Sequence, residues 1–155
     1  MTLPLAYSLE RTFAYDPAVV WEAWTDAAHL ERWYHPTDLR NVPGLTESQA
    51  HVGGRWAVAV DVPAHGFVAY FYGVYTVVEP QRRLQHTMCY TNALDAFTAR
   101  DPDATAHDVV VDFDGHTGGT RVKFSQYGVL PEGQAEKARA GMESYFDSLE
   151  RFLGS

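Results

Sequence analysis

The sequence predicts an α+β fold in which a curved antiparallel sheet of about seven strands wraps around a long C-terminal helix. A segment of strand periodicity opens the chain and is followed by two short helical segments. The middle is a run of strand-like segments separated by turns, and the end is one long amphipathic helix. Strands joined by short turns pair antiparallel, and such a helix needs a sheet face to cover. We expect the 155 residues to form one domain, residues 1–155.

The first strand is expected at residues 7–13, where side chains of opposite faces alternate. Asp16 and Pro17 then supply an N-cap and a proline at the first helical position. Asp26 caps a second short helix, and Pro36 ends it. Two short helices should therefore directly follow the first strand.

Strands are expected at residues 55–62, 67–78 and 84–90, followed by a polar loop over residues 91–106. The last two strands form a hairpin of residues 107–113 and 120–127, with glycines at its turn. Pairing of Phe113 with Thr120 would place His107 opposite Gln126, within hydrogen-bonding reach.

The final helix is expected from Pro131 to about Leu153, with Gly154 as its stop. Its apolar side chains recur at spacings of three and four and form one stripe. The members of this stripe are Ala135, Ala138, Met142, Tyr145, Phe146, Leu149, Phe152 and Leu153.

The formal net charge of −8 argues against nucleic acid or anionic lipid as a partner. The single cysteine, Cys89, excludes an internal disulfide and a zinc site of paired cysteines. No segment has the pattern of a signal peptide or the length of a membrane span, so we expect a cytoplasmic protein without membrane insertion. The 14% of aromatic residues indicates either a dense core or the lining of an apolar pocket.

Strand parity indicates which polar side chains face the interior. Tyr90, His107 and Gln126 should form a polar cluster near one mouth of an otherwise apolar interior, unless they lie in water at a frayed sheet edge. His86 shares the inner face with Met88, either as a hydrogen-bonded lining residue or as a catalytic base.

Other chemistries find little support. The histidines have no chelating spacing, so no metal site is expected. Cys89 and Ser125 have the parity of outward-facing residues, which argues against nucleophilic catalysis. No cofactor is implied.

Motifs along almost the whole chain carry a family resemblance. They are Glu10-Arg11-Thr12-Phe13, Val20-Trp21-Glu22-Ala23-Trp24-Thr25-Asp26, His29-Leu30-Glu31-Arg32-Trp33, Gly53-Gly54-Arg55-Trp56, Pro80-Gln81-Arg82-Arg83-Leu84 and Gly118-Gly119-Thr120-Arg121-Val122. The chain resembles the START/SRPBCC, or birch-pollen-allergen-like, superfamily, and within it the group related to the C-terminal domain of the activator of heat-shock protein 90 ATPase. The resemblance implies the helix-grip fold and a site between the sheet and the C-terminal helix.

The leading hypothesis is a protein that binds a small lipophilic molecule without catalysis. Its candidate ligand-binding residues are Trp33, Trp56, His86, Met88, Tyr90, His107, Phe124, Gln126, Met142, Tyr145, Phe146 and Leu149. One alternative is a cyclase- or hydratase-like enzyme that uses the pocket histidines. A second is a chaperone-interacting protein, as the family name implies.

The strand at residues 67–78 is apolar on both of its faces. Because the helix can cover only one of them, the face of Val68, Tyr70, Tyr72 and Val74 should be exposed. A homodimer through this outer face is the resulting hypothesis.

Overall fold

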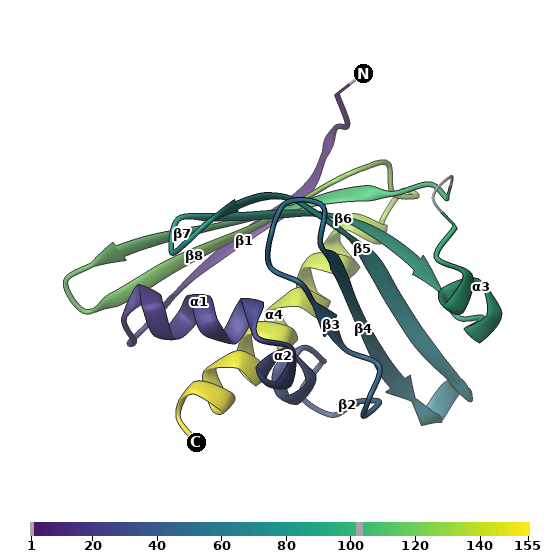
Figure 1. The fold of residues 1–155 in the computed structure, drawn as a ribbon, viewed down its shortest axis with the longest axis horizontal. Coiled ribbons are helices and arrows are strands. Elements are labelled where there is room, and N and C mark those ends of the chain that lie inside the picture. Colours follow the sequence, from purple (N-terminus) through teal and green to yellow (C-terminus); the bar gives the residue numbers. More distant parts are fainter. Residues whose placement is uncertain (1, 102–103) are drawn as a thin grey trace.

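A computed structural model describes residues 2–101 and 104–155 (Figure 1). The elements in chain order are β1 (Leu5–Phe13), α1 (Pro17–Thr25), α2 (Ala27–Trp33), β2 (Arg40–Asn41), β3 (Glu47–Ser48), β4 (Arg55–Val62), the 3-10 turn η1 (Pro63–His65), β5 (Phe67–Glu79), β6 (Arg83–Thr91), α3 (Leu94–Ala99), β7 (His107–His116), β8 (Gly119–Tyr127) and α4 (Gln134–Leu153). The predicted α+β class and the two short helices after the first strand are confirmed.

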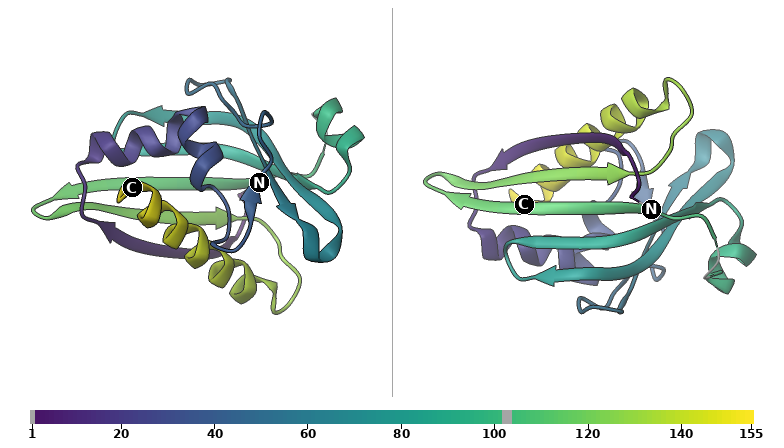
Figure 2. Two further views of the ribbon diagram at one scale, coloured as in Figure 1. Left: turned by 90° about the horizontal axis from the view of Figure 1, so that it is seen from below. Right: turned by 90° about the horizontal axis from the view of Figure 1, so that it is seen from above.

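The strands form one antiparallel sheet in the order β1-β8-β7-β6-β5-β4-β2, and β3 pairs with β4 beside this path. The sheet curls into a half-barrel (Figures 1 and 2). Helices α1, α2 and α4 lie on its concave side, and α4 crosses that side diagonally (Figure 2). This is the helix-grip arrangement that the sequence predicted.

Helix α4 is held against the sheet by an apolar stripe and an ionic contact. Met142, Phe146 and Leu149 are buried against the sheet, as the spacing of the stripe predicts. Arg11 of β1 forms salt bridges with Glu143 at 2.9 Å and Asp147 at 2.7 Å on the helix. The first strand is thus joined directly to the last helix.

The β7–β8 hairpin differs in register from the prediction. Its turn is tighter, with His116 paired to Gly119, so that Phe113 lies opposite Val122 and Gln126 lies opposite Val109. The slip is two residues, and because side chains alternate with a period of two, every inward-facing residue keeps its face. His107 and Gln126 are therefore diagonal neighbours rather than directly opposed.

Helix α3 lies within the segment predicted as a polar loop, of which residues 102 and 103 fall outside the described chain. It covers the outer side of β5, where Phe97 stacks on Tyr70 with ring centroids 4.6 Å apart. Tyr70, Tyr72 and Cys89 are buried beneath the helix. The prediction that Tyr70 and Tyr72 are exposed is wrong, because the chain supplies its own cover, whereas Val74 on the same face is exposed as predicted. Most of the apolar surface on which the homodimer hypothesis rested is therefore already buried.

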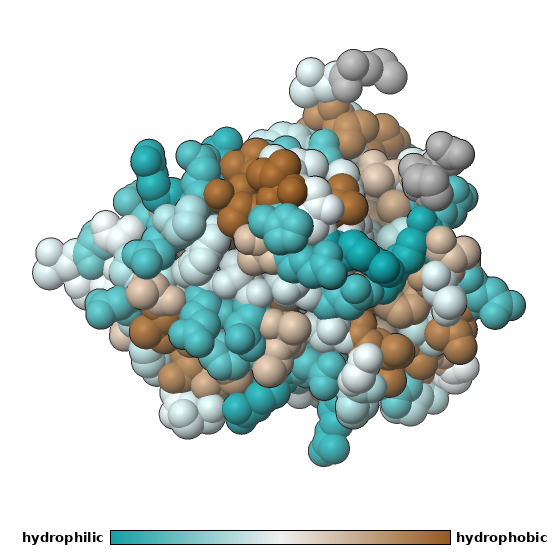
Figure 3. Space-filling model, viewed as in Figure 1, coloured by the Kyte–Doolittle hydropathy of each residue, from teal (hydrophilic) through white to brown (hydrophobic). Residues whose placement is uncertain are grey.

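Polar and apolar residues are interspersed over the surface seen in Figure 3, where hydrophilic side chains separate the brown apolar patches. Among residues 2–101 and 104–155, no helix is long and apolar enough to cross a membrane.

Candidate functional site

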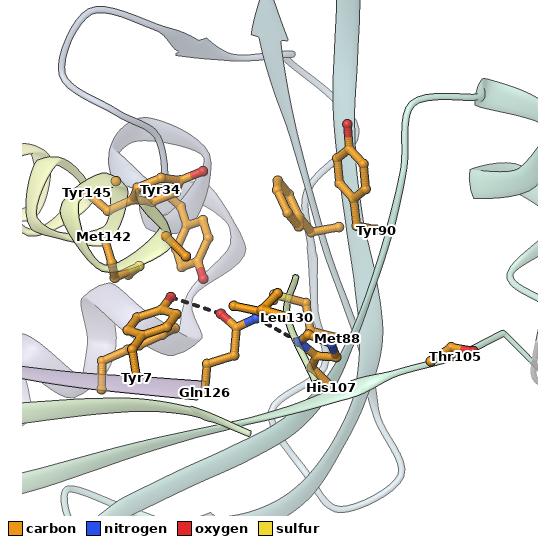
Figure 4. Close-up of a pocket in the computed structure, with 14 residues that line it drawn as sticks. Tyr7, Tyr34, Met88, Tyr90, Thr105, His107, Gln126, Leu130, Met142 and Tyr145 are labelled. Atoms are coloured by element: carbon orange, nitrogen blue, oxygen red, sulfur yellow. Dashed lines mark hydrogen bonds between the residues drawn. The ribbon is translucent and has the colours of Figure 1, made fainter. Parts of the chain in front are cut away.

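A cavity of about 470 Å³ lies between the concave face of the sheet and the N-terminal half of α4. Its walls come from strands β1, β5, β6, β7 and β8, from α4, and from the segments that follow α2, α3 and β8. The lining residues are Tyr7, Tyr34, Phe71, Met88, Tyr90, Thr105, His107, Phe124, Gln126, Leu130, Ala138, Gly141, Met142 and Tyr145 (Figure 4). None of these described residues is Asp, Glu, Lys or Arg, so the surface that they present is apolar apart from hydroxyl, amide and imidazole groups.

Three of the polar groups form a hydrogen-bonded chain across the floor of the cavity (Figure 4). The Tyr7 hydroxyl donates to Oε1 of Gln126 at 2.9 Å, and Nε2 of Gln126 donates to Nδ1 of His107 at 2.8 Å. With the amide in this orientation, Nδ1 is an acceptor, and the neutral ring carries its proton on Nε2. Gln126 thus determines which His107 nitrogen can donate a hydrogen bond.

Gly128 leaves room for the His107 ring because it has no side chain. Its φ of +154° is unfavourable for other residues, and a Cβ at this position would lie 2.4 Å from Cδ2 of the His107 ring. Only glycine lets the backbone pass this close to the imidazole.

Tyr34 and Tyr145 form a second polar group, with ring centroids 5.1 Å apart and the rings edge to face. Within the described chain, neither hydroxyl has a hydrogen-bond partner. Burial raises the pKa of both phenols well above the usual value, as it does for Tyr7. All three phenols therefore stay protonated further into the alkaline range than an exposed tyrosine.

Of the residues predicted for the site, seven line this cavity. They are Met88, Tyr90, His107, Phe124, Gln126, Met142 and Tyr145. Tyr90 lies at the outer edge with 55% of its surface exposed, and Figure 4 shows it apart from the inner tyrosines.

The other five predicted residues pack in the core beneath the cavity rather than along its wall. They are Trp33, Trp56, His86, Phe146 and Leu149. The Trp33 indole donates to the carbonyl oxygen of Ala23 at 2.7 Å, which anchors α2 to α1. These side chains shape the site from behind.

His86 is a structural residue by its surroundings. Its ring stacks on Trp56 with centroids 4.1 Å apart, and its Nδ1 donates to the carbonyl oxygen of Thr87 at 2.8 Å. Burial lowers its pKa to about 4, so the ring is neutral near pH 7. Because it has 1% exposure and does not line the cavity, it cannot exchange a proton with a bound molecule.

Sequence reasoning missed several lining residues, of which Tyr7, Tyr34 and Gly141 matter most. Tyr7 shares parity with the buried Leu9 in β1 and could have been found in this way. Ala138 and Gly141 are small residues three apart near the stripe of α4, a signal that space is left beside the helix. Tyr34 follows the end of α2, where no periodicity could indicate its direction.

The sequence of residues 14–154 matches the family described as Activator of Hsp90 ATPase homolog 1-like protein. The chain belongs to this family. The match covers nearly the whole chain and confirms the resemblance carried by the motifs. No curated protein matches the sequence.

Solved structures with this fold are similar over nearly their full length. A protein from Chromobacterium violaceum has a TM-score of 0.79 and 20% identity, with 96% of this chain and 97% of that chain covered. An AHSA1 protein from Silicibacter pomeroyi has a TM-score of 0.77 and 19% identity, with 96% of each chain covered. An AHSA1-like protein from Aeromonas hydrophila has a TM-score of 0.72 and 23% identity, with 96% and 91% covered. At these identities the likeness establishes that members of the Activator of Hsp90 ATPase homolog 1-like family share the helix-grip fold with this chain.

Proposed function

We propose that this protein binds a small lipophilic molecule, without chemical conversion, in the cavity between the sheet and α4. The observation that carries the proposal is the cavity itself, which is about 470 Å³ in size and has no charged side chain among its described lining residues. This volume lies within the range of sites that enclose drug-sized ligands.

The apolar side chains of the lining support an apolar occupant. Phe71, Phe124 and Leu130 present apolar surface that is unfavourable to leave against water. Met88 and Met142 face the same space, and their unbranched side chains adapt to ligands of different outline.

Gly141 provides a direct test, because an added Cβ at this helical position meets no atom within 4 Å. A Gly141→Leu side chain would project into the cavity from α4 and occupy the space of a ligand. Ala140→Leu is the matched control, since Ala140 is the neighbouring residue of the same helix and is exposed.

The uncharged dye N-phenyl-1-naphthylamine, which fluoresces in apolar surroundings, would report binding. We expect saturable binding to the unsubstituted protein and to Ala140→Leu, and at least a tenfold loss of affinity in Gly141→Leu with thermal stability retained. The absence of saturable binding to the unsubstituted protein, or equal affinity in the two variants, would refute the proposal. Native mass spectrometry of the purified protein would then identify any natural ligand retained.

Acid–base catalysis by His107 is a second candidate, favoured because this ring lines the cavity. Its weakness is that Nδ1 already accepts a hydrogen bond from Gln126, which leaves the neutral ring a donor rather than a base at Nε2. Turnover of a bound ligand that disappears in His107→Ala would favour this candidate over simple binding.

The family name raises a chaperone partner as a further alternative. Acceleration of the ATPase activity of Hsp90 by the added protein would support that role. Because the lining of the cavity suits a small ligand rather than a protein partner, we expect no acceleration of the ATPase activity.

A further inference from the structure

Of the three inner tyrosines, Tyr7, Tyr34 and Tyr145, only Tyr7 donates its hydroxyl proton to another residue of the described chain. This difference indicates which chemical groups a ligand should have. The Tyr7 proton is used, because that hydroxyl donates to Gln126. The protons of Tyr34 and Tyr145 have no acceptor within the described residues, although both side chains line the cavity. An occupant that fills the cavity takes these hydroxyls out of contact with water, and each donor is then costly to leave unpaired unless the occupant supplies an acceptor.

The positions of these two hydroxyls are set by rigid packing. The Tyr34 side chain is 4% exposed and its ring lies edge to face with Trp56 at 5.7 Å between centroids. The carbonyl oxygen of Tyr34 accepts a hydrogen bond from Nδ2 of Asn41 at 2.9 Å, which anchors its backbone. Figure 4 shows Tyr34, Tyr145 and Met142 gathered on one side of the cavity, away from the mouth residue Tyr90. The donors are therefore preorganised at the inner end.

The lining also limits the charge of the occupant. None of the described lining residues is Arg or Lys, so they offer a bound carboxylate or phosphate no ion-pair partner. Among the lining residues that the structure describes there is also no Asp or Glu, so these residues give an ammonium group no ion-pair partner. The burial that raises the pKa of the inner phenols penalises any charged group placed beside them.

We propose that the ligand is an uncharged, largely apolar molecule with a carbonyl-type acceptor that receives a hydrogen bond from the hydroxyl of Tyr34 or of Tyr145. This inference rests on the proposed binding function and names its ligand class. A carbonyl oxygen offers two lone pairs and no proton, which matches the unused donors. The acceptor enters first and the apolar body fills the space towards Phe71 and Met88.

The matched pair of xanthone and xanthene tests this class, because the two tricyclic molecules differ only in a carbonyl in place of a methylene group. Both are added to the unsubstituted protein, to a Tyr34→Phe/Tyr145→Phe double variant and to the control Tyr127→Phe, whose tyrosine does not line the cavity. Affinity is measured by displacement of N-phenyl-1-naphthylamine. Xanthone-2-carboxylate is the charged comparison. Removal of hydroxyls that make no hydrogen bond within the described chain should leave the fold intact, and a thermal unfolding curve checks this.

We expect the unsubstituted protein and Tyr127→Phe to prefer xanthone over xanthene by about fivefold, the range of one net hydrogen bond. The double variant should bind both molecules equally, and the carboxylate should bind more weakly than xanthone to every form. Equal binding of xanthone and xanthene by the unsubstituted protein, a preference that survives in the double variant, or tighter binding of the carboxylate would each overturn the ligand class while leaving the binding function standing. Failure of both neutral molecules to bind would overturn the two proposals together.

Discussion

Gln126 hydrogen-bonds the ring of His107 at 2.8 Å although the two residues are not paired in the β7–β8 ladder. Gln126 lies opposite Val109, and its side chain reaches diagonally to the imidazole at the start of β7. Diagonal neighbours on one face of an antiparallel pair are within reach of a side chain of this length. The contact joins the end of the hairpin to Tyr7 of β1 and so closes the floor of the cavity.

Substitution of Gly128 should disturb this floor. In Gly128→Ala the new methyl group would meet the His107 ring, so we expect the hydrogen bond to Gln126 to break and dye affinity to fall about threefold or more. Gly118→Ala is the control, because it also places a Cβ at positive φ but meets no atom within 4 Å. Both variants should lose stability through backbone strain, and only Gly128→Ala should shift the His107 ring signals in NMR spectra. Unchanged His107 signals in Gly128→Ala would contradict this prediction.

His86 should make the stability of the protein depend on pH in a defined window. Its pKa is about 4 in the folded state against 6.5 for an exposed histidine, so the unfolded chain takes up a proton first as the pH falls. Stability is therefore fully present above about pH 6.5 and is lost towards pH 4, by about 3 kcal/mol in total from this residue.

Urea unfolding at pH 7 and at pH 5 measures that effect. His86→Gln should be less stable at pH 7 and should show a smaller difference between the two pH values, whereas His51→Gln at an exposed position should behave like the unsubstituted protein. An undiminished pH dependence in His86→Gln would rule out this histidine as its source.

Arg11 should contribute to the docking of α4 on the sheet. Arg11→Ala removes salt bridges to Glu143 and Asp147, and because the three side chains form a network we expect a loss of about 1 kcal/mol in the free energy of unfolding. High salt should weaken the stabilising contribution of the network. Arg121→Ala, which removes an exposed pair with Asp114, should cost less than about 0.5 kcal/mol. Equal losses of unfolding free energy in Arg11→Ala and Arg121→Ala would show that the contact of Arg11 with α4 stabilises the fold no more than an exposed ion pair does.

Phe97 should keep the outer face of β5 covered. Phe97→Ala removes the ring that stacks on Tyr70. The centroid of the same ring lies 4.0 Å from Cζ of the Arg100 guanidinium group. We expect destabilisation by about 3 kcal/mol and more self-association in light scattering, because Tyr70 and Tyr72 lose their cover. Leu94→Ala in the same helix is the control, since Leu94 is 55% exposed. A dimer already formed by the unsubstituted protein through this face, and unchanged in Phe97→Ala, would show that α3 does not act as the cover.

Predictions from local pattern succeeded where one face of an element is buried. The stripe of α4 placed Met142 and Phe146 on the buried side, and strand parity placed His107 and Gln126 on the inner face despite the slip in register. Parity could not separate residues that line the cavity from residues that fill the core. His86 and Met88 share one strand face, yet His86 is sealed under Trp56 and only Met88 lines the space.

The amino-acid sequence by itself determined the α+β class, the family and the residues that face inward, because these follow from periodicity and motifs that are local or ordered along the chain. Only the tertiary structure decided where the interior stays open, because that depends on how α4 crosses a curved sheet and on the small side chains of Ala138 and Gly141 at the crossing. It also brought Tyr7, Tyr34 and Tyr145 together from three distant segments. Their shared burial, rather than any sequence spacing, raises the pKa of the three phenols above the usual value.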